Sequence, residues 1–102
     1  MNVKIHSVKF DADMKLLNFI EDKVGKLEVF YDDILGAEVF LRLEKDTLER
    51  ENKIVEIKLD IARNLLFSKK QSKTFEEATD IATDALRKQI IKHKDKVKKY
   101  NA

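Results

Sequence analysis

The sequence predicts an α+β fold with four strands and two helices in the order β-α-β-β-β-α. Apolar residues alternate with polar ones in four segments and recur at helical spacing in two others. The 102-residue chain has no Pro, two Gly and no internal repeat or low-complexity tract, so it shows no sign of a linker. A chain of this length can bury roughly 65% of its unfolded surface. We therefore predict a single domain spanning residues 1–102.

The first strand and the first helix are predicted near the N-terminus. Val3 and Ile5 alternate with polar neighbours, and apolar residues resume at Val8 and Phe10, which indicates a strand that can carry a bulge. A helix should follow, with Asp11 or Asp13 as its N-cap. Its apolar residues at helical spacing are Leu16, Leu17, Ile20, Val24 and Leu27.

Three further strands are predicted in the middle of the chain. Residues 37–45 place Val39, Leu41 and Leu43 on one face, and residues 65–73 are a shorter candidate. Residues 53–63 place on one face Val55, Ile57, Leu59 and Ile61. The polar segment 44–52 predicts an exposed hairpin loop, and the next turn should lie near Arg63 and Asn64.

The last helix should begin at Thr74, because Thr74 and Glu77 have the spacing of a capping box. The side predicted to pack on the sheet comprises Phe75, Ala78, Ile81, Ala82, Ala85, Leu86 and Gln89. Past Ile90 the same side reads Lys92, His93 and Lys96, so cations replace apolar residues. We expect the helix end, about residues 91–102, to protrude beyond the sheet or to fray.

Positive charge is concentrated at the C-terminal end, LRKQIIKHKDKVKKYNA. Residues 69–102 hold 10 basic and 5 acidic side chains, whereas residues 1–68 hold 11 and 14, within a total charge of +2. A basic surface of this kind attracts polyanions such as RNA. The alternative for the same residues is a solvated helix end with no partner.

Several classes of function find no support in the sequence. Cys is absent, two His residues cannot form a metal site by themselves, and neither a Gly-rich phosphate loop nor a GxSxG motif occurs. No apolar run approaches the roughly 18 residues of a membrane span. We therefore predict a soluble cytoplasmic protein that is not an enzyme, uses no metal or cofactor, has no small-molecule substrate and does not contact a membrane.

Two segments resemble a known family. NFIEDKVGKLE is similar to the first helix, and FEEATDIATDALRKQIIKHKDK to the second, of the ribosome hibernation promoting factor and ribosome-associated inhibitor family in its short form. The resemblance is best at Lys88, Gln89, Lys92, His93 and Lys94. It implies two helices on one face of a four-stranded sheet, similar to a double-stranded-RNA-binding domain. It also implies a protein, monomeric off the ribosome, that blocks the small subunit's channel for messenger and transfer RNA by contacting ribosomal RNA.

The resemblance also implies which residues contact RNA. It points to Lys88, Lys92, Lys94 and Lys96 on the second helix and to Lys23 and Lys26 on the first. Segment 68–73 departs from the family's small or acidic residues, which adds Lys69, Lys70 and Lys73 to the basic surface. Ser7 and Val8 replace a Gly and a basic residue that many members have. The predicted set is completed by Arg87, His93, Lys98 and Lys99.

Other features sharpen the prediction. Lys greatly outnumbers Arg, which favours recognition of RNA backbone and shape over base reading. Tyr100 is a candidate for base stacking, while the core should contain Phe10, Phe19, Phe30 and Phe75. Because the sequence ends at Ala102 without the long form's extra domain, we expect the chain alone not to pair ribosomes. Two alternatives stay open: a general structured-RNA-binding module, and a protein-interaction domain that docks partners through the acidic hairpin from Glu44 to Glu51 and the basic helix.

Overall fold

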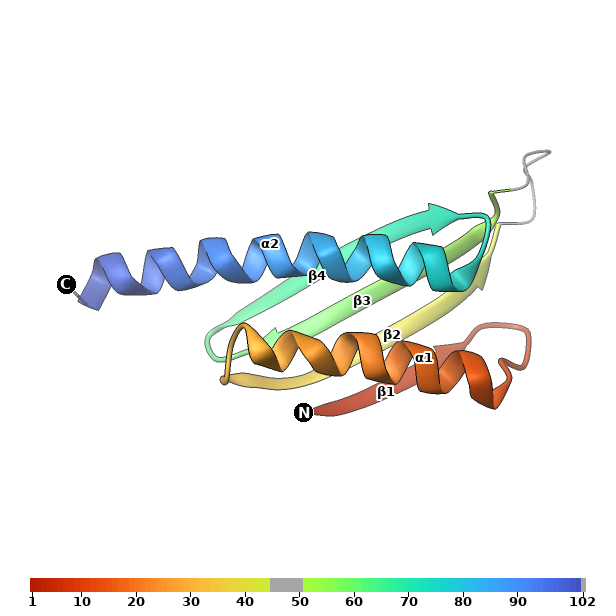
Figure 1. Cartoon of the computed structure of the whole chain (residues 1–102), viewed down its shortest axis with the longest axis horizontal. Coiled ribbons are helices and arrows are strands. Elements are labelled where there is room, and N and C mark those ends of the chain that lie inside the picture. The colour runs from red at the N-terminus through yellow and green to blue at the C-terminus, as the bar shows by residue number, and fades with distance from the viewer. Residues whose placement is uncertain (45–50, 102) are drawn as a thin grey trace.

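The predicted order of elements, β-α-β-β-β-α, is confirmed. The computed structural model describes residues 1–44 and 51–101, with side chains through Lys98. Its elements are β1 (Asn2–Ser7), α1 (Met14–Gly25), the short 3-10 helix η1 (Lys26–Val29), β2 (Ile34–Leu43), β3 (Lys53–Ile61), β4 (Asn64–Ser72) and α2 (Phe75–Asn101). Figure 1 shows α2 as the longest element, running across the sheet and past the turn that joins β3 to β4.

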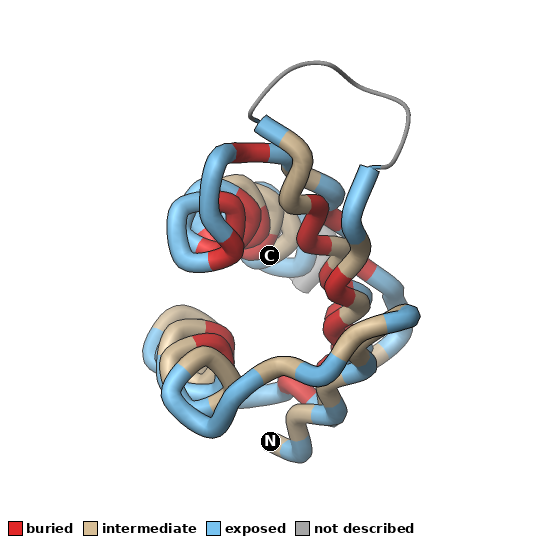
Figure 2. The backbone as a smooth tube through the Cα atoms, turned by 90° about the vertical axis from the view of Figure 1, so that its right-hand side faces the viewer, coloured by how far each residue is buried: buried red, intermediate tan, exposed pale blue. Residues whose placement is uncertain are grey.

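The four strands form one mixed sheet in the order β1-β2-β3-β4. β1 is parallel to β2, and the other two pairs are antiparallel. Both helices cover the same face, so the molecule has a helix layer and a sheet layer (Figure 2). Pairing of Ile5 with Val39 and of Val39 with Ile57 aligns their side chains toward the helices. The core between the layers is built from these rows and from the apolar sides of α1 and α2.

β1 ends at Ser7, so the predicted continuation of the strand to Phe10 is wrong. The amide of Val8 still donates to the Leu41 carbonyl at 2.9 Å, but Lys9 adopts a φ of 65° and turns the chain away from the sheet. The Phe10 ring then stacks on Phe75 at the start of α2, with centroids 5.2 Å apart.

α1 begins where the sequence predicts. Of the two candidate N-caps, Asp13 serves: its carboxylate accepts from the Leu16 amide at 2.8 Å. α1 ends at Gly25 and tightens into η1, which buries Leu27 beside Ile20 and Val24. This tightening places Phe30 and Tyr31 against the core.

The sheet differs from prediction in the lengths of two strands. β2 begins at Ile34 with a bulge before Gly36, and β4 is as long as β3 rather than shorter. Leu43 faces the predicted side but lies at the strand end and is 41% exposed. The turn predicted near Arg63 is confirmed, with Arg63 at a φ of 67°. Most of the predicted hairpin loop 44–52 lies outside the described residues.

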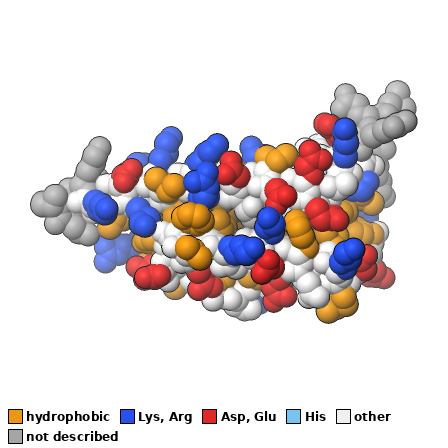
Figure 3. Space-filling view, in the orientation of Figure 1, with side chains coloured by type: hydrophobic (Ala, Val, Ile, Leu, Met, Phe, Trp, Pro, Cys, Tyr) orange, Lys and Arg blue, Asp and Glu red, His pale blue; other side chains and the backbone are white. Residues whose placement is uncertain are grey.

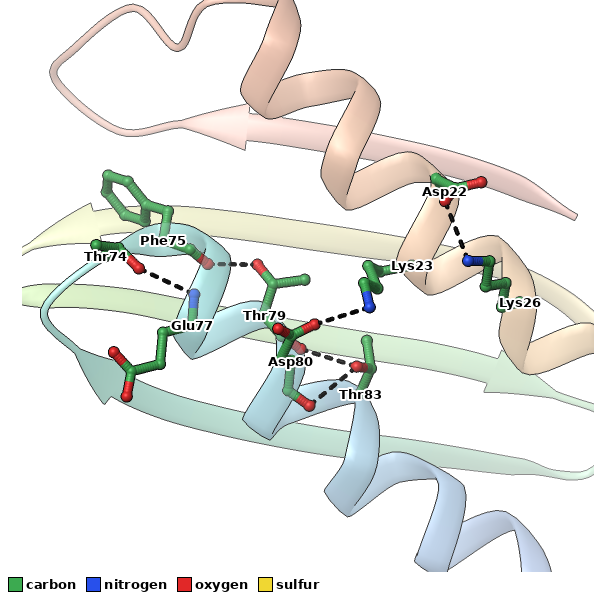
Figure 4. Close-up of polar contacts among 9 residues, drawn as sticks. All are labelled: Asp22, Lys23, Lys26, Thr74, Phe75, Glu77, Thr79, Asp80 and Thr83. Atoms are coloured by element: carbon green, nitrogen blue, oxygen red, sulfur yellow. Dashed lines mark hydrogen bonds and ion pairs between the residues drawn. The ribbon is translucent and has the colours of Figure 1, made fainter.

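The side of α2 that packs on the sheet differs from the predicted one at Ile81, which is 43% exposed. The buried side is instead made by Phe75, Ala78, Thr79, Ala82, Thr83, Leu86 and Ile90. These positions follow the 3.6-residue period, whereas Ile81 lies on the opposite side of the helix. Two buried threonines escaped prediction because they are polar. Their hydroxyls donate to backbone carbonyls one turn earlier, from Thr79 to Phe75 and from Thr83 to Thr79 (Figure 4).

Candidate nucleic-acid interface

Among the side chains of α2 that the structure describes, through Lys98, Ile90 is the last buried one. Between Ile91 and Lys98 every residue is exposed except the half-buried His93, and Figure 1 shows this part of the helix extending past the sheet. We call residues 91–98 the overhang. A helix segment without a sheet behind it presents most of its circumference to a partner.

The overhang carries four exposed lysines, and Figure 3 shows cationic side chains gathered along this end of α2. At about 100° per residue, Lys92 and Lys96 lie on one side of the helix, and Lys94 and Lys98 lie nearly opposite. Within residues 1–44 and 51–98, none of the four forms an ion pair. Their charges are therefore available to phosphates on two sides.

His93 does not share the exposure of these lysines. Its ring meets Tyr31 edge-on, with centroids 5.5 Å apart, and its Nε2 atom is enclosed without a hydrogen-bond partner among the described residues. His93 thus continues the packed side of α2 one turn past the sheet, while Lys92 and Lys96 lie away from that side. Because Nε2 is enclosed, it is not accessible to a phosphate group in this conformation.

The cations behind the overhang are held in ion pairs. Lys23 of α1 contacts Asp80 of α2 at 3.2 Å and thereby links the two helices, and Lys26 contacts Asp22 at 3.3 Å (Figure 4). All of these side chains are at least one-third exposed, so each pair contributes little to stability, on the order of 0–1 kcal/mol.

Asp84 binds two of the predicted contact residues at once. Its carboxylate accepts from Arg87 at 3.0 Å and lies 3.3 Å from the Lys88 ammonium. Hydrogen bonds from Arg87 and then Lys88 lower the pKa of Asp84 below its ordinary value. The acid is therefore ionised at neutral pH and neutralises part of the cationic surface of α2. Arg87 also lies over the Phe30 ring, 5.9 Å from its centroid.

The three lysines predicted around β4 do not form one surface with the overhang. Lys69 lies on the face of the sheet opposite the helices, 3.9 Å from Glu56. Lys70 is half-buried, and its pairing with Val55 places it on the helix side. Lys73 is exposed just before α2, about 25 Å of helix away from Lys92. The side chain of Lys99 and that of Tyr100 lie outside the described residues.

The four aromatic residues predicted for the core do pack there: Phe75 is buried, while Phe10, Phe19 and Phe30 are partly buried against it. Two other aromatic residues, Phe40 and Phe67, received no assignment from the sequence. Both lie on the sheet face that the helices leave uncovered, with Phe67 46% exposed. The sequence could have predicted this outward position, because Phe40 and Phe67 each alternate with core residues of their own strand.

The described residues place no three His, Asp or Glu side chains where they could hold a metal ion. Within the same residues, no helix is long and apolar enough to span a membrane.

Fold and surface together define a class of small α+β protein, in which a long basic helix runs off the edge of a four-stranded sheet. Within that class, the chain belongs to the family described as sigma 54 modulation protein / S30EA ribosomal protein, whose model matches residues 3–98. The resemblance inferred from the two helix segments is thereby confirmed.

Individual relatives agree with this assignment. The ribosome hibernation promotion factor of Bacillus subtilis (strain 168) is 34% identical over 97 residues, which are 95% of this chain and 50% of that protein. The chain thus spans half the length of that relative. The ribosome hibernation promoting factor of Klebsiella oxytoca is 29% identical over 100 residues, 98% of each protein. A solved structure, a ribosomal subunit interface protein from Coxiella burnetii, superposes with a TM-score of 0.80 at 17% identity, covering 93% of this chain and 99% of that one. This structural similarity, at such low sequence identity, concerns the fold alone.

Proposed function

We propose that this chain is a ribosome hibernation factor, a non-enzymatic protein that binds the small ribosomal subunit. In this proposal it contacts ribosomal RNA through the overhang and occupies the channel for messenger and transfer RNA. It inhibits translation by filling that space and requires no cofactor.

The single observation that carries the RNA contact is the set of lysines at 92, 94, 96 and 98, which form no ion pair with the described residues and lie on a helix segment with no sheet behind it. Lysine is a compact charge with three rotatable donors, so it suits phosphates without requiring one base sequence. Lysines on opposite sides of one helix can contact phosphates of two RNA strands that enclose it. Family membership points to the ribosome as the source of that RNA.

Steric inhibition fits the dimensions of the molecule. Its principal extents are 51 × 25 × 17 Å, and the overhang is one helix only about 10–12 Å wide. In the proposed arrangement the overhang enters between RNA segments, and the two-layered body fills the wider space behind it. Occlusion of this kind needs no chemical step.

Competition on small subunits tests the proposal. Purified chain is incubated with small subunits, and binding of a labelled transfer RNA programmed by a short messenger is measured by filter retention. We expect the chain to co-sediment with the subunits and to reduce transfer RNA binding in proportion to its occupancy. Co-sedimentation without competition would refute the channel site while leaving ribosome binding intact.

Salt dependence distinguishes this function from protein docking, and binding to isolated RNA distinguishes it from general RNA binding. If the four lysines of the overhang neutralise phosphates, the duplex scale gives a log-log slope near −3.6, or about 10²-fold weaker binding between 50 and 200 mM salt. A general module should bind an isolated RNA duplex as tightly as it binds the subunit. A hibernation factor should prefer the assembled subunit, because only there is the overhang enclosed.

A further inference from the structure

The sheet has a second surface that the proposed function does not use. Both helices cover one face of the sheet (Figure 2). The outward side chains of the strands therefore form a second face, which no helix of the described residues covers. The register places two rows of outward residues across all four strands. The first row is His6, Phe40, Glu56 and Lys69, and the second is Lys4, Glu38, Lys58 and Phe67.

Phe40 lies at the centre of an aromatic and cationic cluster on this face. The His6 ring stacks on Phe40 with centroids 4.9 Å apart and planes 20° from parallel. Lys58 and Arg42 lie over the same ring, 5.5 and 5.7 Å from its centroid. Glu38 accepts from His6 at 3.1 Å and so fixes the outer ring of the stack. The His6 side chain is 46% exposed, which leaves area on it for a further planar group.

Phe67 supplies a second exposed ring. It pairs with Lys58 across β3 and β4, so Lys58 lies between Phe67 and the Phe40 cluster. Two strand spacings separate β2 from β4, which puts the rings about 10 Å apart across the sheet. Aromatic rings on adjacent rows of an uncovered four-stranded sheet, with cations between them, suit a chain of planar groups joined by phosphates.

The charges around the rings favour the same ligand. Arg42, Lys58 and Lys69 lie beside two acids, Glu56 and Glu38, which leaves a net charge of +1. Glu56 is only 16% exposed, beneath Arg42 at 3.2 Å and Lys69 at 3.9 Å. Glu56 is therefore covered, while the two cations, 42% and 56% exposed, face outward. A polyanion meets the cations first.

We propose that this surface, the sheet platform of His6, Phe40, Arg42, Lys58, Phe67 and Lys69, binds a short segment of unpaired RNA. Bases stack on the His6–Phe40 pair and on Phe67, and phosphates meet Lys58, Arg42 and Lys69. The RNA is unpaired because a base inside a duplex has no free face to stack. The platform is separate from the overhang, so the chain has two RNA surfaces of different kinds.

The test measures binding of a fluorescent oligouridylate of eight nucleotides and of an RNA duplex, by anisotropy at low salt. Variants Phe67→Leu and Phe40→Leu keep apolar volume but lose the aromatic face, and Phe67→Trp keeps it. The matched control is Lys92→Gln with Lys96→Gln, which alters the overhang alone. Circular dichroism checks folding, and the exposed Phe67 provides a site where folding is not at risk.

We expect the oligouridylate to bind the parent chain and each leucine variant to bind it at least about five-fold more weakly, the lower end of the value for one stacked base. Phe67→Trp should retain binding and report it by fluorescence quenching. The overhang control should weaken binding of the oligouridylate less than it weakens co-sedimentation with ribosomes. Two results would overturn the proposal: no binding of the single strand by the parent, or equal binding by the folded Phe67→Leu variant. Neither result bears on the overhang, because ribosome co-sedimentation of the same variants is measured separately.

Discussion

The two halves of α2 belong to one continuous helix but differ in almost every physical respect. Residues 75–90 lie on the sheet, bury an apolar side and hold their outward cations in ion pairs, as Arg87 and Lys88 do with Asp84. The overhang buries little, and its four lysines have Asp95 as the only acid between them. The first half stabilises the fold, and the second half presents charge.

Net charge alone therefore does not show which cations are free to meet a phosphate. Lys23, Lys26, Arg87 and Lys88 carry the same formal charge as the four lysines of the overhang, yet each must leave an intramolecular partner to meet a phosphate. A lysine without such a partner binds phosphate at no such cost. We therefore expect the unpaired set to dominate binding, and the following experiments test that ranking.

The largest effect is expected from reversing charge in the overhang. Changing Lys92, Lys94 and Lys96 together to Glu should weaken ribosome binding by about 10³-fold or more, taking each charge-assisted contact as at least about 1.5 kcal/mol. Co-sedimentation and inhibition of cell-free translation measure the change. Because acids oppose the dipole at a helix C-terminus, the corresponding Gln variant guards against fraying.

A charge-matched control separates contact from net charge. Changing Lys4, Lys9 and Lys15 to Glu alters the total charge equally, at exposed positions on β1, the following loop and α1. We expect a much smaller loss, limited to long-range attraction that salt screens. Equal losses in the two triple variants would contradict the ranking of α2's halves.

For the free energy of unfolding we expect the reverse ranking, with the larger effect in residues 75–90 and the smaller one in the overhang. Ile90→Ala removes a fully buried side chain at the end of residues 75–90, the half of α2 that lies on the sheet. This change should lower the free energy of unfolding by about 2–5 kcal/mol. Val97→Ala, at a position 37% exposed in the overhang, should cost less than about 1 kcal/mol. Urea denaturation followed by circular dichroism gives both values. A comparable cost at Val97 would mean that the overhang is packed rather than free.

A smaller effect is expected from releasing paired cations. Asp84→Asn frees both Arg87 and Lys88, so ribosome binding should tighten by a few-fold and its salt slope should steepen by up to about two. Asp95→Asn adds the same charge, but the described residues show no ion pair that it would release. Its slope should stay unchanged. An unchanged slope for Asp84→Asn as well would indicate that the paired cations already contact phosphate, or never do.

Much of this arrangement was predictable from the sequence, and the exceptions have physical causes. Strict alternation identified β3, and the capping threonine located the start of α2, where the Glu77 amide donates to Thr74 at 3.0 Å. The predicted burial of Ile81 was wrong for two reasons. An apolar side chain can lie on the exposed side of a helix, and the buried side of α2 is partly made of threonines. The end of β1 depended on the left-handed backbone at Lys9, a conformation that Lys does not signal.

The exposed lysines of the candidate interface could be located from the sequence, but the contacts of the other cations could not. Charge counting placed the lysines of the overhang, and the helical period gives their directions. It could not show that Lys23 pairs across helices with Asp80, because the two residues are distant in sequence. Nor did it show that His93 turns toward Tyr31, since that contact depends on the packing of η1. Ion pairs and edge contacts depend on tertiary distances that periodicity does not encode.

The smallest predicted effect is the titration of Asp84 itself. Its pKa in the folded chain is lowered, chiefly by hydrogen bonds from Arg87 and then Lys88. A carboxylate whose folded pKa lies below its unfolded value, about 3.9, stabilises the fold above that value and loses the contribution as the pH falls through the folded pKa. The contacts of Asp84 with Arg87 and Lys88 therefore persist at neutral pH and open only in acid. Carbon-detected NMR titration of Asp84 should give a midpoint below the ordinary value, and Arg87→Gln with Lys88→Gln should move it upward.

A midpoint that does not move would show that these two cations do not hold the carboxylate in solution. Both halves of α2 would then offer free cations, and their contrast would reduce to burial alone.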